Sequence, residues 1–246
     1  MIDRVRKELR AAAGTKDPLM RRQQDQMANQ FRKCRLEDKA KLDFCLLKML
    51  TDIRPQFRVG IPEVNVPRLD PMVIPNILVE ESVPLVKITA QFMQVVVEGA
   101  SSFQPTNVHA EPDIVFVSMV IPELHINGLY TINGNVMLLP LHGNGTFWVL
   151  LNDIQAHTST NLLVQRNHLQ VLRTNIQFNV GKIQLRLNNL FGGNNFIGET
   201  VNRALNENSQ QILDSVKPRI AERISEAVRN ILNEAFSNLP ANAFVS

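Results

Sequence analysis

Apolar and polar residues alternate through most of residues 83–187. The first run places Val86, Ile88 and Ala90 on one side, and the last run alternates Ile183, Leu185 and Leu187 with polar residues. A period of two is the pattern of a strand with one buried face. Several runs exceed the usual length of a strand in a compact sandwich, and no β-α-β alternation is present. The pattern therefore predicts a strongly curved antiparallel sheet.

Turn-forming residues interrupt these runs at three places, which are Asn127-Gly128, Asn133-Gly134 and residues 142–145. Asparagine followed by glycine favours the tight turn of a β-hairpin, because both residues tolerate a positive φ. We expect these positions to join successive antiparallel strands.

From Ile197 onward the apolar period changes from two to about 3.6, and the stripe continues for about 40 positions, or roughly 60 Å of helix. Pro218 interrupts the stripe and should bend the helix. A helix this long cannot bury its stripe alone, and the apolar face of the sheet is the partner that the sequence offers. A coiled coil is the alternative, disfavoured by Pro218 and by the lack of steady charge pairing. The expected fold is α+β, with a long C-terminal helix wrapped by a curved sheet.

A shorter helix is predicted over Lys39–Ile53 from the helical spacing of its apolar residues, ending before Pro55. Five prolines within residues 54–75 then forbid a long helix and favour a path over a surface or along a sheet edge. Residues 1–33 are polar and contain no apolar core of a signal peptide. We therefore divide the chain into a poorly ordered tail, 1–33, and one domain, 34–246.

The positive charge belongs to that tail. The net charge is +3, but residues 1–33 carry nine basic and four acidic residues, leaving 17 basic and 19 acidic residues in the body. A nearly neutral body lacks the positive surface that nucleic acid requires. No stretch reaches the ~18 apolar residues of a membrane-spanning helix, so stable membrane insertion is not expected.

Residues with catalytic or metal-binding chemistry are scattered. There is no G-x-S-x-G motif, the five histidines show no metal-ligand spacing, and Gly192-Gly193 lacks the rest of a phosphate loop. We expect no enzyme activity, no metal and no cofactor. An apolar interior suits the binding of an apolar molecule, although periodicity alone cannot distinguish a tunnel from a solid core. Cys34 and Cys45 form either one disulfide or two separate buried thiols. Asn144-Gly145-Thr146 is a candidate N-glycosylation site.

Several blocks in order resemble one family. CLLKMLTDIRPQFRVGIPEVNVPRLDPM, GLYTINGNVMLLPLHGNG, LNNLFGG, VNRALNENSQQILDSVKPRIAERISEAV and LPANAF are similar to segments of the insect takeout and juvenile hormone binding protein family, within the tubular lipid-binding superfamily. The resemblance covers about residues 34–244. It implies a super-roll with a hydrophobic tunnel, no cofactor, and a Cys34–Cys45 disulfide. The juvenile hormone carriers of the family usually have a second disulfide, which a chain with two cysteines cannot form. The resemblance is therefore nearer to the takeout branch.

The family implies secretion, into haemolymph or sensory and fat-body tissue. The missing signal peptide means that the chain is either a fragment or altered gene model, or a member that is not conventionally secreted; we favour the first and expect an extracellular protein. The family usually has tryptophan where Ser209 stands, a change that would loosen packing or widen one end of the tunnel.

The expected function is carriage of a small lipophilic ligand, such as juvenile hormone, a fatty acid or a related terpenoid. The alternative is a regulatory or protein-interaction module with a solid interior. Both functions are consistent with a monomer and with binding to a cell-surface receptor. Tyr130 and Trp148 are expected to donate hydrogen bonds to the ligand. The residues expected to line the tunnel combine inward strand positions with the helix stripe: Phe92, Phe116, Tyr130, Trp148, Val201, Leu205, Ile212 and Val216.

Overall fold

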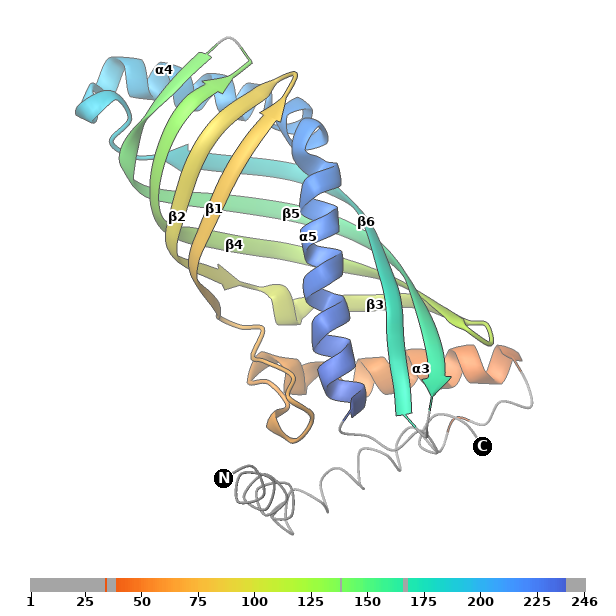
Figure 1. Ribbon diagram of the computed structural model, residues 1–246. Helices are drawn as coiled ribbons and strands as arrows, with labels where there is room; N and C mark the ends of the chain where they lie inside the picture. Colours follow the sequence, from red (N-terminus) through yellow and green to blue (C-terminus); the bar gives the residue numbers. More distant parts are fainter. Residues whose placement is uncertain (1–33, 35–38, 138, 166–167, 238–246) are drawn as a thin grey trace, which may run out of the picture.

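The computed structural model describes residue 34 and residues 39–137, 139–165 and 168–237 (Figure 1). The predicted tail, 1–33, lies outside the described residues. The elements in chain order are α3 (Lys39–Ile53), η1 (Arg54–Arg58), η2 (Pro62–Val64), β1 (Met72–Val83), β2 (Val86–Glu98), η3 (Ala100–Ser102), β3 (Gln104–Ala110), β4 (Ile114–Val136), β5 (Leu139–Gln165), β6 (His168–Leu187), η4 (Phe191–Gly193), α4 (Asn195–Glu207) and α5 (Ser209–Ser237).

The strands form one antiparallel sheet in the order β1-β2-β4-β5-β6, and β3 pairs with β4. β4, β5 and β6 are 23, 27 and 20 residues long. Strands twist along their length, so strands as long as these coil into a curved sheet and do not form a flat one. Figure 1 shows α5 crossing the open side of this curved sheet, and α5 packs along β6. The expected α+β roll around a C-terminal helix is confirmed.

A line of reversed pleating crosses β4, β5 and β6 near their middles. Before it on β5, Phe147 is buried on the inner face together with other odd-numbered residues; after it, Ile154 and Ala156 are buried instead. The change coincides with Asp153, which has φ +54° within the strand, and a Cβ on the neighbouring Gly181 would lie 2.9 Å from the Asp153 Cβ. One left-handed residue rotates the chain by an extra step and exchanges its two faces.

The three expected hairpin positions were wrong. Asn127-Gly128 and Asn133-Gly134 lie inside β4, and residues 142–145 lie inside β5. Gly128 is opposite Phe147 in the register, and a Cβ there would lie 3.1 Å from the Phe147 ring and 2.9 Å from the Met93 carbonyl oxygen. Glycine at this position makes room for an aromatic ring inside the roll. From the sequence alone, a glycine needed for space cannot be distinguished from a glycine needed for a turn.

The helical stripe is divided at Asn208, not at Pro218. Asn208 has non-helical dihedrals between α4 and α5, and its side chain donates a hydrogen bond to the Ala204 carbonyl oxygen. Ser209 begins α5, which continues through Pro218. The Ala204 carbonyl oxygen thus accepts from both the backbone N–H and the side-chain amide of Asn208, and the chain leaves the helical conformation at that residue.

The N-terminal helix was predicted with correct bounds, and a disulfide joins Cys45 of this helix to Cys34, which precedes it. Asp43 on α3 accepts hydrogen bonds from the Ala110 N–H and from His109 Nδ1, both at 2.8 Å, and so fixes α3 to β3. The proline-rich stretch forms η1, η2 and the first residues of β1, an edge strand as expected.

Candidate functional site

Two separate apolar clusters contact α5, one on the inner face of the sheet and one on the segment 57–66 that follows α3. The larger one contains Ile212 and Val216 at the start of α5, and the smaller one contains Ile231 and Ala235 near its end. The middle of α5 belongs to neither cluster, and its apolar residues Ile220 and Ile224 are 36% and 41% exposed. The candidate binding region is therefore the inner face of the sheet opposite the middle of α5.

Six of the eight residues expected to line the interior belong to the larger cluster or pack against it: Phe92, Tyr130, Val201, Leu205, Ile212 and Val216. The other two do not lie where we expected. Phe116 is 37% exposed and Trp148 is 41% exposed, while their strand neighbours alternate into the interior.

The physical reasons for the two misplaced residues differ. Phe116 has the same parity as Tyr130 along β4, but the reversed pleating between them turns Phe116 outward, where it stacks on His109 at 6.2 Å. Trp148 simply follows Phe147, and the Phe147 ring is the one that enters the interior. Both were assigned from alternation, which gives the period but not the face.

Phe147 is the inner aromatic residue that the sequence analysis missed. It is 6% exposed and its ring packs edge-to-face with Phe92, with centroids 5.1 Å apart. Gly128 lies opposite Phe147 in the register and leaves space for its ring. This glycine is the signal that would have selected Phe147, and not Trp148, as the inward-facing residue.

Tyr130 is buried, but its hydroxyl is already engaged. It donates a hydrogen bond of 2.8 Å to the Asn188 carbonyl oxygen, and burial raises the pKa of Tyr130 to about 12. The donor expected for a ligand is thus used to hold the end of β6 against β4. Because Trp148 is on the outer face, its indole N–H is not directed into the interior either.

Side-chain amides close the edge of β6. Asn202, Asn206 and Asn233 each accept from a backbone N–H of β6 and donate to the carbonyl oxygen of the same residue, which is Leu187, Leu185 and Val171 respectively. Ser225 accepts from the Ile176 N–H and Gln210 donates to the Val180 carbonyl oxygen. These contacts replace the missing neighbour strand and fix α4 and α5 along β6.

The opposite edge of the roll is tied to α5 by charge. Arg219 Nε on α5 lies 2.9 Å from Glu81 Oε2 on β1, and the Glu81 side chain is 10% exposed. That oxygen has no aligned hydrogen-bond donor among the described residues, so the contact is an ion pair without a directed hydrogen bond. The contacts of α5 with the two edge strands therefore differ: side-chain amides and hydroxyls bond the backbone of β6, and an ion pair joins α5 to β1.

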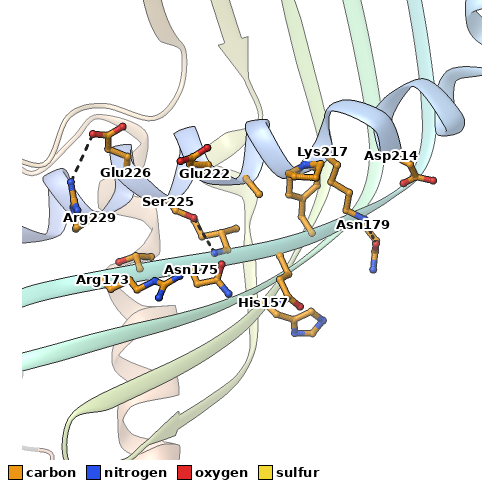
Figure 2. A pocket seen from close by; sticks show the side chains of 16 residues that line it. His157, Arg173, Asn175, Asn179, Asp214, Lys217, Glu222, Ser225, Glu226 and Arg229 are labelled. Carbon is orange, nitrogen blue, oxygen red and sulfur yellow. Dashed lines mark hydrogen bonds and ion pairs between the residues drawn. The ribbon is translucent and has the colours of Figure 1, made fainter. Parts of the chain in front are cut away.

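A groove of about 930 Å³ runs between α5 and β6 (Figure 2). Arg173, Asn175 and Asn179 line its β6 side, and Glu222 and Arg229 line its α5 side. The Ser225–Ile176 hydrogen bond crosses it, as the dashed line in the figure shows. This groove is open and is lined by polar and apolar side chains alike. It differs from the enclosed apolar tunnel that we expected, which stays a prediction.

Within the described part of the chain, no group of three or more His, Cys, Asp or Glu side chains is placed to hold a metal ion. None of the helices that the structure describes is both long and apolar enough to cross a membrane.

A curved sheet rolled around a C-terminal helix, with an apolar inner face, defines the class of tubular binding folds. The family model for haemolymph juvenile hormone binding proteins (JHBP) matches residues 11–246, and the chain belongs to this family. The resemblance found in the sequence is thereby confirmed.

Individual relatives are distant. The chain is 26% identical over 231 residues to the circadian clock-controlled protein daywake of Drosophila yakuba and 22% identical over 232 residues to that of Drosophila melanogaster, in each case covering 87% of this chain and 86% of the relative. The crystal structure of Epiphyas postvittana Takeout 1 superposes with a TM-score of 0.75 at 20% identity, covering 87% of this chain and 98% of that one. At this identity the similarity establishes the fold.

Proposed function

We propose that this protein is a carrier that binds a small lipophilic ligand against the inner face of the roll, opposite the middle of α5. The observation that carries the proposal is the separation of the two apolar clusters along α5, with partly exposed isoleucines between them. A solid core would continue along the whole helix, because leaving apolar surface uncovered forfeits about 25 cal/mol for each Å².

Membership of the juvenile hormone binding family supports this proposal, and juvenile hormone, a fatty acid or a related terpenoid is the expected kind of ligand. The driving force is burial of the ligand's apolar surface. The inner residues Phe92, Phe147 and Ile126, with Ile212 and Val216 of α5, supply aromatic and branched aliphatic surface at one end of this region.

We also propose that the protein works outside the cell. The Cys34–Cys45 disulfide supports an oxidising compartment, since such bonds are rare in the cytosol. The Asn144 side chain is exposed in β5, which is compatible with a glycan at that sequon. A mass decrease on glycosidase treatment of protein from its native source, lost in Asn144→Gln, would support both statements.

The test of carriage is native mass spectrometry of the protein and lipid extraction from it, followed by rebinding of N-phenyl-1-naphthylamine to the delipidated chain. We expect co-purifying apolar molecules and saturable binding of the probe. A chain that is empty when purified and binds no probe contradicts the proposal and favours an interaction module.

Two neighbouring residues of β5 offer a matched pair of variants. Ala156 is buried on the inner face and Gln155 is exposed on the outer face. A ring introduced by Ala156→Phe should compete with the ligand and reduce probe binding, whereas Gln155→Phe should leave binding unchanged. Equal effects of the two would argue against an interior site.

A further inference from the structure

The inner face of the roll changes its chemistry along β5 and β6. Near the larger cluster it is aliphatic and aromatic, but beyond the reversed pleating it carries Thr158, Thr160 and Thr174. Thr160 and Thr174 are partners in the β5–β6 register and are 9% and 7% exposed, and Thr158 pairs with the buried Ile176. Three hydroxyl groups thus lie together on the inner face. Valine has the same shape as threonine and would fill a solid core equally well without a hydroxyl group.

Thr174 is the residue of this group whose polar atom is unsatisfied. Its Oγ1 is closed to solvent and makes no hydrogen bond with any residue that the structure describes. A buried hydroxyl without a partner is costly, and such groups are rare in folded proteins. A hydroxyl that persists there is explained most simply by a partner that arrives with a ligand.

The position of Thr174 joins the interior to the groove. It lies beneath α5 beside Ile176, whose N–H is taken by the hydroxyl of Ser225. The charged side chains that line the groove balance in sign, with Arg173, Lys217 and Arg229 basic and Asp214, Glu222 and Glu226 acidic. Arg229 pairs with Glu226, and Lys217 donates a hydrogen bond to Asn179. Thr174 is an uncharged member of this lining, and its register partner Thr160 does not line the groove.

We propose that the Thr174 hydroxyl is the polar anchor of the binding site and donates a hydrogen bond to one oxygen of an otherwise apolar ligand, with Thr160 flanking it. The proposal rests on the carrier function proposed above. Because the three basic side chains of the groove are balanced by three acidic ones, a buried carboxylate would lose its hydration without gaining a net counter-charge, and the ligand's oxygen belongs to a neutral ester, carbonyl or alcohol. The ligand then lies with its oxygen end beneath the middle of α5 and its hydrocarbon part toward Phe92 and Phe147.

The experiment compares displacement of N-phenyl-1-naphthylamine by a medium-chain fatty methyl ester, the free acid, and the alkane of the same length. Thr174→Val removes the hydroxyl but keeps the shape of the side chain. We expect it to weaken the ester about three- to tenfold, the effect of one neutral hydrogen bond, and to leave the alkane unchanged. Thr174→Ser should retain ester binding, and Thr131→Val, on the exposed face of β4, should change neither ligand.

Each other outcome has a definite meaning. Thr174→Val with wild-type ester affinity, or with equal losses for ester and alkane, overturns the anchor while leaving the carrier function intact. Free acid binding more tightly than ester overturns the neutral-ligand assignment. A wild-type chain that none of the three compounds occupies contradicts the carrier function itself.

Discussion

The side-chain amide of Asn206 pairs with both backbone groups of Leu185, accepting from its N–H at 2.9 Å and donating to its carbonyl oxygen at 2.8 Å. It replaces a neighbouring strand at the edge of β6. Asn206→Ala should lower the free energy of unfolding by about 1–3 kcal/mol, because two part-buried backbone groups lose their partners. Chemical denaturation measures this, with Gln211→Ala, at an exposed position of α5, as the control. Equal stability of both variants would show that water replaces the amide without cost.

The neighbouring rings of Phe147 and Trp148 point to opposite faces of β5, and they give a second prediction. Phe147→Ala should lower the free energy of unfolding by about 3–5 kcal/mol by emptying space beside Phe92, whereas Trp148→Ala should change it by about 0.5 kcal/mol. Trp148 is the single tryptophan of the chain, so its fluorescence reports the outer face. We expect iodide to quench it and a ligand in the interior to leave its emission maximum unchanged. A blue shift on ligand binding would place the indole inside.

Asp153 gives a third prediction, on the backbone. Its φ of +54° lies in the left-handed region, which aspartate tolerates better than a β-branched residue. Asp153→Val should therefore lower the free energy of unfolding by about 1–2 kcal/mol, and Asp153→Gly should cost little or nothing. Thermal unfolding of the two variants beside Gln155→Val separates the backbone effect from general strand propensity. A valine variant as stable as the glycine variant would mean that the reversed pleating does not depend on this residue.

The contact between α3 and β3 should depend on pH. The hydrogen bond with Asp43 is the main reason that the pKa of His109 is raised, with Glu111 adding a weaker attraction and desolvation opposing both. The folded state therefore favours protonated His109. Its stabilising contribution is fully present below the unfolded pKa of about 6.5 and is lost as pH rises through the higher folded value.

The measurement is the unfolding midpoint of wild type minus that of His109→Gln, followed from about pH 5 to pH 9. We expect the difference to fall as pH rises, and Asp43→Asn to abolish the trend. Parallel curves for wild type and His109→Gln would show that the pair does not contribute to folding.

Much of the fold could be predicted from the sequence because local pattern determines it. The helical spacing between Leu42 and Ile53 gave α3, and the change of period at Ile197 gave the C-terminal helix. The prolines before Asn76 indicated an edge strand because proline cannot donate a ladder hydrogen bond. The need to bury a long stripe then required a sheet that wraps it.

The faces and breaks could not be predicted in this way. Asn127-Gly128 has the composition of a turn, but Gly128 is there to admit Phe147 from the adjacent strand. Asn208 rather than Pro218 separates α4 from α5, and its side-chain amide bonds the Ala204 carbonyl oxygen beside its own backbone N–H. The inward face of a strand depends on contacts with residues distant in sequence, and the break between the two helices depends on the rotamer of one side chain.

The sequence by itself determined which residues alternate, which form a helical stripe, and the family to which they belong. Only the tertiary structure decided which face looks inward. One left-handed residue, Asp153, exchanges the two faces of a strand without altering its period, and its effect appears only in the register with Gly181. The line of reversed pleating to which Asp153 belongs also crosses β4 and β6, so that Phe116 faces outward and the register partners Thr160 and Thr174 face inward.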